Sequence, residues 1–316
     1  MDIVVCIDER FVMPAGVMIY SVCANNQEED ISFHIVVDES VTQNDKKDLI
    51  ETVSTYPMKK ILFYNINSQM VSSFPLIRND LTRSTYYRLY LTEILPDTID
   101  KILYIDCDCI IRHSLIHLWK TELTGYAVAA VIEATEGDIK RYNRLKYSPF
   151  FGYFNAGVLL INLDFWRHNK VINLFSECAD KYGERIQAED QDILNVVFAN
   201  NFIRLPVKYN LQPMFLYQEL ECDYWKYEKE IEDAKRDPVI IHFLGRVKPW
   251  DAYIREPHPF SSSFYKYQSQ TIWKDCRDER RSMKLRIKNF LADNLRRIKL
   301  KSPLNNMYIR TLKPVD

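Results

Sequence analysis

Apolar stretches of strand length alternate along the chain with segments in which apolar residues recur at helical spacing. The strand-like stretches cover residues 2–7, 31–38, 60–66, 101–108, 126–132 and 157–163. The helical patterns cover residues 17–26, 43–56, 86–95 and 164–181. This order predicts an α/β fold of Rossmann type, with a mostly parallel sheet and helices on both of its faces. Ligands of such sheets bind beyond the carboxyl ends of the strands, so polar residues there are the first candidates for a site.

Two carboxylates stand at the end of the strand-like stretch 101–108. Asp106 and Asp108 are separated only by Cys107, and burying two like charges side by side is costly because of desolvation and repulsion. On an extended segment, residues i and i+2 project to the same side. The two carboxylates could then share one divalent cation, with Cys107 turned the opposite way, into the core. Alternatively, Asp108 has already left the strand and caps a turn.

A second polar cluster follows the apolar stretch that begins at residue 238. His242 ends this stretch, and Gly245 and Lys248 come just after it. The histidine could supply a nitrogen ligand, the glycine would let the backbone approach a ligand closely, and the lysine would place a compact charge near phosphate. Two carboxylates and one imidazole leave about three positions of an octahedron open. This ligand set favours Mn²⁺, with Mg²⁺ as the second possibility.

Polar residues also accompany two later apolar segments and one aromatic one. Three of them precede the strand-like stretch 157–163 or open it, and three stand before the apolar start of a helix: Asn155, Ala156, Gly157, Asp190, Gln191 and Asp192. Asp192 alone could be a helix cap, but three adjacent acid and amide groups exceed what a cap needs and suit a hydroxyl-rich ligand. Arg88 lies on an aromatic helix face, where the alternative to a role in the site is a buried structural ion pair.

Four motifs together resemble retaining glycosyltransferase family 8, and most of all the bacterial branch that adds galactose or glucose to lipooligosaccharide. In chain order the motifs are LYIDCD, FNAGVLLINL, DQDILN and HFLGRVKPW. The resemblance extends from residue 1 to about residue 260. It implies the Rossmann-type fold that is called GT-A in glycosyltransferases. It also implies UDP-galactose or UDP-glucose as the donor and a glycan or glycolipid as the acceptor.

The resemblance also implies a role for each candidate residue. Asp106, Asp108 and His242 would bind Mn²⁺ and, through it, the diphosphate, while Gly245 and Lys248 would hold the phosphates. The residues expected around the nucleotide and the donor sugar are Asp8, Phe11, Arg88, Asn155, Ala156, Gly157, Asp190 and Gln191.

Within that second set the expected roles differ. Asp8 would contact uracil, and Phe11 stands where the family often has a tyrosine that stacks on the base. The catalytic candidates are Arg88, Asp190 and Gln191. We expect transfer with retained anomeric configuration by front-face attack, in which the departing phosphate oxygen takes the acceptor proton. A covalent intermediate on Asp190 is the alternative.

Two other classes of protein remain open at this point. Phosphotransferases of the haloacid dehalogenase type also use Asp-x-Asp at a strand end. They usually have Thr or Val where this chain has Ile110, and they carry the motif on the first strand, whereas here three strands precede it. The second class is a non-catalytic binder of nucleotide sugars on the same fold.

The charge is unevenly distributed, although the net formal charge is only −1. Residues 274–316 carry about +8 and the rest of the chain about −9. Within this segment, residues 283–301 alternate bases with aliphatic residues at helical spacing, as in helices that lie on anionic membranes. A solvated helix that covers the catalytic domain and a nucleic-acid-binding arm are the alternatives, and the aliphatic face disfavours nucleic acid. We therefore expect a catalytic domain over residues 1–265 and a basic, membrane-associating helical segment over residues 266–316.

The remaining composition bears on the compartment. The chain starts without the pattern of a signal peptide, and no apolar run reaches the roughly 18 residues that span a bilayer. Its seven cysteines are widely spaced and form no C-x-x-C, which indicates reduced thiols. These features predict a cytoplasmic protein, bound peripherally to the inner face of the membrane.

Overall fold

The computed structural model describes most of residues 1–276. The residues that it does not describe are 73, 75–81, 217–223, 246, 252–257 and 277–316. Seven strands form the central sheet: β1 (Asp2–Ile7), β2 (Ile31–Val37), β3 (Lys59–Asn65), β4 (Lys101–Ile105), β6 (Val128–Ile132), β7 (Phe154–Asn162) and β8 (Phe202–Arg204). Their order in the sheet is β3-β2-β1-β4-β7-β6-β8. Only β7 runs antiparallel to its two neighbours, and every other pairing is parallel. The predicted mostly parallel sheet is confirmed.

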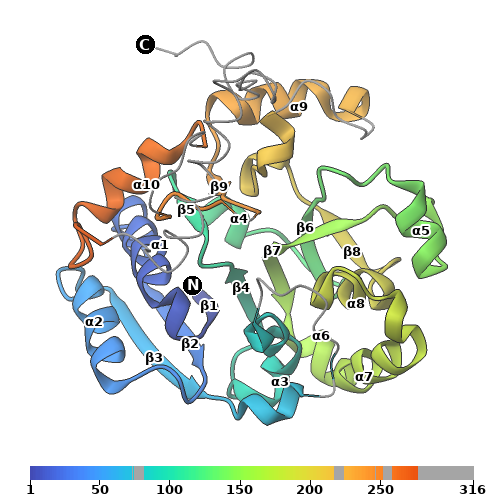
Figure 1. The fold of residues 1–316 in the computed structure, drawn as a ribbon, viewed down its shortest axis with the longest axis horizontal. Helices are drawn as coiled ribbons and strands as arrows, with labels where there is room; N and C mark the ends of the chain where they lie inside the picture. Colours follow the sequence, from blue (N-terminus) through green and yellow to red (C-terminus); the bar gives the residue numbers. More distant parts are fainter. Residues whose placement is uncertain (73, 75–81, 217–223, 246, 252–257, 277–316) are drawn as a thin grey trace, which may run out of the picture.

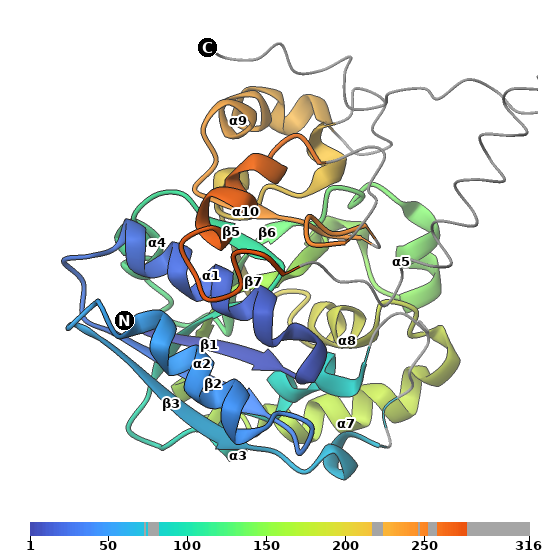
Figure 2. The same cartoon turned by 60° about the vertical axis from the view of Figure 1, so that its left-hand side comes forward.

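Helices cover both faces of this sheet (Figures 1 and 2). The α-helices are α1 (Val12–Asn25), α2 (Gln43–Val53), α3 (Leu91–Ile94), α4 (Ile116–Trp119), α5 (Ile139–Leu145), α6 (Leu163–His168), α7 (Val171–Tyr182), α8 (Glu189–Val197), α9 (Tyr224–Arg236) and α10 (Ser261–Gln268). The 3₁₀ helices are η1 (Glu9–Phe11), η2 (Ser68–Val71), η3 (Arg83–Tyr90), η4 (Pro149–Phe151), η5 (Gly183–Arg185), η6 (Val207–Tyr209) and η7 (Pro213–Leu216). The layers agree with the predicted helix–sheet–helix arrangement.

The two faces of the sheet bury separate hydrophobic cores, because successive side chains of a strand point to opposite faces. In β1, Ile3, Val5 and Ile7 pack into the core with α1 and α2, whereas Val4 and Cys6 pack into the core with η3, α7 and α8. Each fully buried aliphatic side chain stabilises the fold by about 1.5–3 kcal/mol. A one-residue slip of a strand would exchange the two faces, so the cores fix the register that brings the strand ends together.

A small second sheet joins two segments that are far apart in the sequence. It consists of β5 (Cys109–Ile111) and β9 (Ile240–His242), which pair antiparallel with Cys109 opposite His242. The backbone N–H of Phe243 donates to the carbonyl of Asp108 at 2.9 Å. This pairing sets His242 beside the Asp106–Asp108 segment.

The bounds of two predicted strands and one predicted helix differ in the structure. The strand predicted over residues 101–108 ends at Ile105, and the chain then turns, with the N–H of Cys109 donating to the carbonyl of Asp106 at 3.1 Å. The strand predicted to begin at residue 157 already begins at Phe154, so the Asn-Ala-Gly motif lies inside β7. The single helix predicted over residues 164–181 is divided into α6 and α7 at Lys170, whose φ of 48° is left-handed.

The C-terminal part of the described chain packs against α1 and the small β5–β9 sheet. The expected domain boundary between residues 265 and 266 falls inside α10. Tyr267, after this boundary, packs into the same hydrophobic core as Phe264, before it. Trp273 lies so close to Gly16 of α1 that an added Cβ there would come within 1.9 Å of its ring. The basic segment 283–301 lies outside the described residues. Among the helices that the structure describes, none is long and apolar enough to cross a membrane.

Candidate active site

A cavity of about 480 Å³ opens at the carboxyl ends of β1 and β4. Side chains and backbone from β1, η3, β4, β7 and α8, and from the segment after β9, line it. All of the candidate residues predicted from the sequence line this cavity except Asp8 and Asp192. The fold thus brings together residues from segments that are distant in the sequence.

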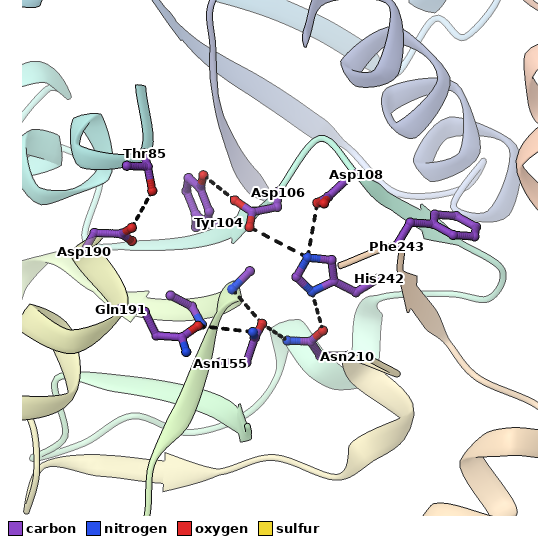
Figure 3. A network of polar contacts seen from close by, with 12 residues as sticks. Thr85, Tyr104, Asp106, Asp108, Asn155, Asp190, Gln191, Asn210, His242 and Phe243 are labelled. Atoms are coloured by element: carbon purple, nitrogen blue, oxygen red, sulfur yellow. Dashed lines mark hydrogen bonds and ion pairs between the residues drawn. The ribbon is translucent and has the colours of Figure 1, made fainter. Parts of the chain in front are cut away.

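One end of the cavity is a cluster of charged groups around His242 (Figure 3). The His242 side chain is 1% exposed, and its Nε2 lies 3.2 Å from Asp108 Oδ1 and 3.9 Å from Asp106 Oδ2. This nitrogen has no hydrogen-bond partner of good geometry among the described residues. A buried imidazole nitrogen that lies this close to two carboxylates fits the predicted cation site, because a divalent cation would satisfy all three groups at once.

Cys109 is a fourth candidate ligand that the sequence did not single out. Asp108, Cys109 and His242 each offer one ligand atom, and these atoms lie within 4.8 Å of one another. Burial, and after it the carboxylates of Asp108 and Asp106, raise the pKa of Cys109 well above its usual value. In the absence of a cation, the thiol therefore keeps its proton.

Lys248 closes the charged end of the cavity. Its Nζ lies 2.5 Å from Asp108 Oδ2 and donates to the carbonyl of Phe243 at 2.8 Å. Burial alone would raise the pKa of Asp108, but Lys248 and His242 hold it below its usual range. Burial alone would lower the pKa of His242, but Asp108 and Asp106 raise it. Gly245, just before Lys248, has a φ of 107°, a conformation that favours glycine.

Arg88 connects the charged end to the middle of the cavity. Its Nη2 donates to Asp106 Oδ1 at 2.9 Å, its Nε lies 3.0 Å from Asp190 Oδ2, and its Nη1 donates to the carbonyl of Ala156 at 2.6 Å. The guanidinium lies 4.1 Å from the ring centre of Tyr104. Arg88 thus forms the buried ion pair that the sequence suggested as an alternative, with Asp106 and Asp190 as its partners. It also lines the cavity.

Asp190 is a buried carboxylate whose two oxygens are both engaged. Thr85 Oγ1 donates to Oδ1 (Figure 3), and Arg88 Nε lies 3.0 Å from Oδ2. Burial raises the pKa of Asp190 to about 6, even though Arg88 and Thr85 act in the opposite direction. Its charge therefore changes near neutral pH.

The other end of the cavity is a network of amides around Gln191. Gln191 Oε1 accepts from the N–H of Ala156 at 3.0 Å and from Asn155 Nδ2 at 3.1 Å. Glu133 Oε2 accepts from Asn155 Nδ2 at 2.9 Å and from Gln191 Nε2 at 3.2 Å. The sequence analysis missed Glu133, although it directly follows the strand-like stretch 126–132 and could have been found there.

Gly157 lies where the two ends of the cavity meet. A Cβ at this position would come within 2.3 Å of Cε1 of His242. Glycine is therefore needed at residue 157 because the imidazole packs directly on the backbone of β7.

Asp8 and Phe11 lie at a third corner of the site, after β1. Asp8 caps η1 by accepting from the N–H of Arg10 at 2.9 Å, and Thr82 Oγ1 donates to its other oxygen at 2.5 Å. Phe11 is partly buried and lines the cavity.

Comparison with known proteins assigns the chain to a family. The family model described as glycosyl transferase family 8 matches residues 2–253. The chain belongs to glycosyltransferase family 8. General stress protein A of Bacillus subtilis is 28% identical, over 86% of this chain and 94% of that protein. A lipopolysaccharide 1,2-glucosyltransferase of Escherichia coli is 31% identical, over 77% of this chain and 71% of that protein.

A solved structure agrees with this assignment. The crystal structure of galactosyltransferase LgtC in complex with donor and acceptor sugar analogs has a TM-score of 0.75 at 26% identity, over 86% of this chain and 96% of that one. The resemblance, the GT-A-like fold and the prediction of an enzyme are confirmed. The dehalogenase-type phosphotransferase and the non-catalytic binder lose their basis, because this family 8 chain is a glycosyltransferase.

Two details of this glycosyltransferase differ from the sequence predictions. Asp192, expected to face a hydroxyl-rich ligand together with Asp190 and Gln191, does not line the cavity. It lies inside α8, pairs with Arg144 Nη1 at 2.6 Å and accepts from the N–H of Gln187 at 2.7 Å, so it supports the wall of the site. Cys107 packs against the core but also lines the cavity. It does not turn away from both carboxylates, because residues 106–109 form a turn and not a strand.

Proposed function

We propose that this protein is a retaining, Mn²⁺-dependent hexosyltransferase that moves galactose or glucose from a UDP-sugar to a hydroxyl of a cell-surface glycan or glycolipid. One observation supports the proposal: a single cavity has a buried cluster of carboxylate, imidazole and ammonium groups at one end and a network of amides at the other. A diphosphate needs positive charge, whereas a hexose needs donors and acceptors at fixed angles. Relatives named as galactosyl- and glucosyltransferases support a hexose as the transferred group.

The charged end suits the leaving group. As the bond between the anomeric carbon and the diphosphate oxygen breaks, negative charge grows on the diphosphate. Asp106, Asp108 and His242 would hold Mn²⁺, which when bound acts as a Lewis acid toward that charge. Lys248 contributes a second positive charge beside Asp108, and Gly245 lets the backbone approach the phosphates.

The rest of the cavity suits the sugar and the nucleotide. Asn155 and Gln191 are held in one orientation by their mutual hydrogen bond and by the N–H of Ala156, so they can bind hydroxyls without reorganising in the transition state. Asp8 and Phe11 would recognise the uracil ring.

Retention of configuration can follow from attack on the same face as departure. The acceptor hydroxyl oxygen bonds to the anomeric carbon, and its proton passes to the departing diphosphate oxygen. We favour this path over a covalent intermediate on Asp190. Both oxygens of Asp190 already contact Thr85 and Arg88, which suits a positioning group better than a nucleophile.

A donor screen tests the proposal. The full chain is incubated with Mn²⁺ and a set of UDP-sugars, UDP release is measured, and the anomeric configuration of any product is read by NMR. We expect turnover of UDP-galactose or UDP-glucose with retention. The assignment is wrong if no UDP-sugar is turned over and Asp108→Asn leaves nucleotide affinity unchanged. A glycosyl adduct trapped on Asp190 would overturn the front-face path.

We further propose that the basic segment within residues 266–316 holds the enzyme on the cytoplasmic, inner face of an anionic membrane. The support is its excess of bases and their alternation with aliphatic residues at helical spacing. Each Lys or Arg near such a surface contributes about 1 kcal/mol of binding. The acceptor would then be presented at the membrane.

Charge reversal in the full chain tests this second proposal. Replacing Lys284 and Lys288 by Glu should abolish co-sedimentation with phosphatidylserine vesicles and leave turnover of a soluble acceptor unchanged. The matched control replaces two exposed lysines of the catalytic domain, Lys47 and Lys140, and should bind vesicles like the parent protein. Equal vesicle binding by both variants would refute the proposal.

A further inference from the structure

Asn210, which follows η6, connects the two ends of the cavity. Its side chain is fully buried. Its Oδ1 lies 2.9 Å from His242 Nδ1, and its Nδ2 donates to Asn155 Oδ1 at 2.8 Å (Figure 3). Asn210 does not line the cavity itself. It therefore acts only through the residues on either side of it.

Backbone N–H groups determine which atom donates and which accepts in each of the hydrogen bonds that link Asn155, Asn210 and His242. The oxygen and nitrogen of a side-chain amide have similar shapes, so their assignment needs a partner whose role is known. The N–H of Gly157 is such a partner, because it can only donate, and it lies 2.9 Å from the Asn155 side-chain oxygen. Asn155 must therefore accept with this atom, Asn210 must present its NH₂ group to it, and the Asn210 oxygen is left for His242.

A second backbone group gives the same answer independently. The N–H of Ala156 donates to Gln191 Oε1 at 3.0 Å, which fixes this atom as an acceptor. Asn155 Nδ2 donates to the same oxygen at 3.1 Å. Asn155 thus presents its nitrogen to Gln191 and its oxygen to Asn210, in agreement with the orientation that Gly157 requires.

The orientation of Asn210 determines which nitrogen of His242 carries the hydrogen. An amide oxygen only accepts, so His242 Nδ1 must donate to it. In a neutral imidazole the other nitrogen, Nε2, then has a free lone pair. This is the nitrogen that faces Asp108 and Asp106 without a hydrogen-bond partner among the described residues.

We propose that Asn210 is a positioning residue that holds His242 in the Nδ1–H tautomer and so presents Nε2 to the metal ion; the inference rests on the proposed function of His242 as a metal ligand. Outer partners of metal-binding histidines typically change metal affinity by about 10–100-fold. Through Asn155, the same residue ties the metal ligand to the amides of the sugar end. The backbone N–H groups of Ala156 and Gly157 in β7 thus determine how the side-chain amides of Gln191, Asn155 and Asn210 are oriented.

The first test replaces Asn210 by Leu, which has a similar size but no polar group. The chain has six histidines, so ¹⁵N-histidine NMR spectra of the metal-free protein are simple, and the spectrum of a His242→Gln variant assigns the ring of interest. Spectra are recorded well above the raised pKa of His242, where the ring is neutral. We expect His242 to lose the pure Nδ1–H form and Mn²⁺ affinity, measured by calorimetry, to fall about 10–100-fold. An unchanged tautomer in the folded variant would overturn the proposal.

The second test replaces Asn210 by Asp and keeps the inference falsifiable if the leucine variant does not fold. A carboxylate still accepts from His242 Nδ1, so the Nδ1–H tautomer should persist, whereas its second oxygen cannot donate to Asn155 Oδ1 and that hydrogen bond is lost. An Nε2–H ring in this variant would contradict the proposal.

Gln212 provides the matched control. It is a buried amide two residues further on, but its partners are the N–H of Ala134, at 2.8 Å, and the carbonyl of Ile132, also at 2.8 Å. Gln212→Met should lower stability and leave the His242 tautomer and Mn²⁺ affinity unchanged; a tautomer change here would count against a specific role of Asn210. Both readouts use Mn²⁺ or the metal-free protein, so they remain decisive even if no UDP-sugar is turned over.

Discussion

The two ends of the cavity are built from different kinds of groups. At one end, Asp108, His242 and Lys248 are ionisable, and they lie close enough to shift one another's pKa. At the other end, Asn155 and Gln191 are neutral amides whose orientation is fixed by backbone N–H groups. Charged groups can accommodate a cation and a diphosphate, whereas fixed dipoles can orient a neutral sugar. We therefore expect changes at the first end to alter metal affinity, and changes at the second to alter the rate of the bound complex.

The largest effect is expected from Asp108→Asn, at the charged end. This change removes one carboxylate from the cation site and leaves Lys248 Nζ without its carboxylate partner, which lies 2.5 Å away. We expect kcat/KM to fall on the order of 10³-fold, with loss of Mn²⁺ binding in calorimetry. Asp164→Asn, at an exposed carboxylate of α6, is the control and should change neither. Unaltered Mn²⁺ affinity in the Asp108 variant would break the distinction between the two ends.

The amide end should respond differently to Gln191→Ala. This change removes an oriented amide but no charge, and the hydrogen bonds of Gln191 go to Asn155, Ala156 and Glu133, none of which is a candidate metal ligand. We expect kcat to fall by about 10²-fold while Mn²⁺ affinity stays the same. Single-turnover kinetics and calorimetry measure the two quantities separately. A drop in Mn²⁺ affinity as large as that of the Asp108 variant would mean that the two ends act as one unit.

The same contrast explains how much of the site could be predicted from the sequence. At the charged end, Asp106, Asp108 and His242 stand at the carboxyl ends of apolar stretches, and local pattern is enough to select them. The pairing that brings them together was not predictable, because β5 and β9 have only three residues each. Such short strands have no periodicity of their own and form only where the rest of the fold places them.

The amide end could be predicted only in part. Asn155 and Gln191 belong to recognisable motifs, and Glu133 could have been found at the end of its strand. Asn210 has no such signal, because it follows a 3₁₀ helix of three residues and its role depends entirely on partners that are distant in the sequence. Sequence patterns thus identify residues of recognisable motifs and strand ends more readily than residues such as Asn210, which lie beside short irregular elements and act through distant partners.

An intermediate effect is expected from Gly157→Ala, where the two ends meet. The added methyl group would come within 2.3 Å of the His242 ring, so the imidazole must shift from its position beside the carboxylates. We expect Mn²⁺ affinity to fall by about 10–100-fold. In Gly125→Ala the added methyl meets no described atom within 4 Å, so the control should cost only backbone strain, about 1 kcal/mol of stability. Full Mn²⁺ affinity in the Gly157 variant would show that His242 is not held by this contact.

The smallest effect concerns Asp190, which lies between the two ends, and it is an effect of pH on stability. Burial raises the pKa of this carboxyl to about 6 in the folded protein, from a usual value of 3.8. The folded state therefore binds the proton more tightly than the unfolded state, and this contribution to stability is complete below the usual pKa and is lost as the pH rises through about 6. The shift corresponds to roughly 3 kcal/mol of unfolding free energy.

Asp190→Asn cannot titrate and should lack this decline in stability with rising pH. Urea unfolding of both proteins at pH values from about 4 to about 7 measures the difference, and the exposed Asp164→Asn control should follow the parent curve. If the curves of the parent and the Asp190 variant run parallel, Arg88 compensates fully for the burial of this carboxylate, and Asp190 belongs with the charged end of the cavity.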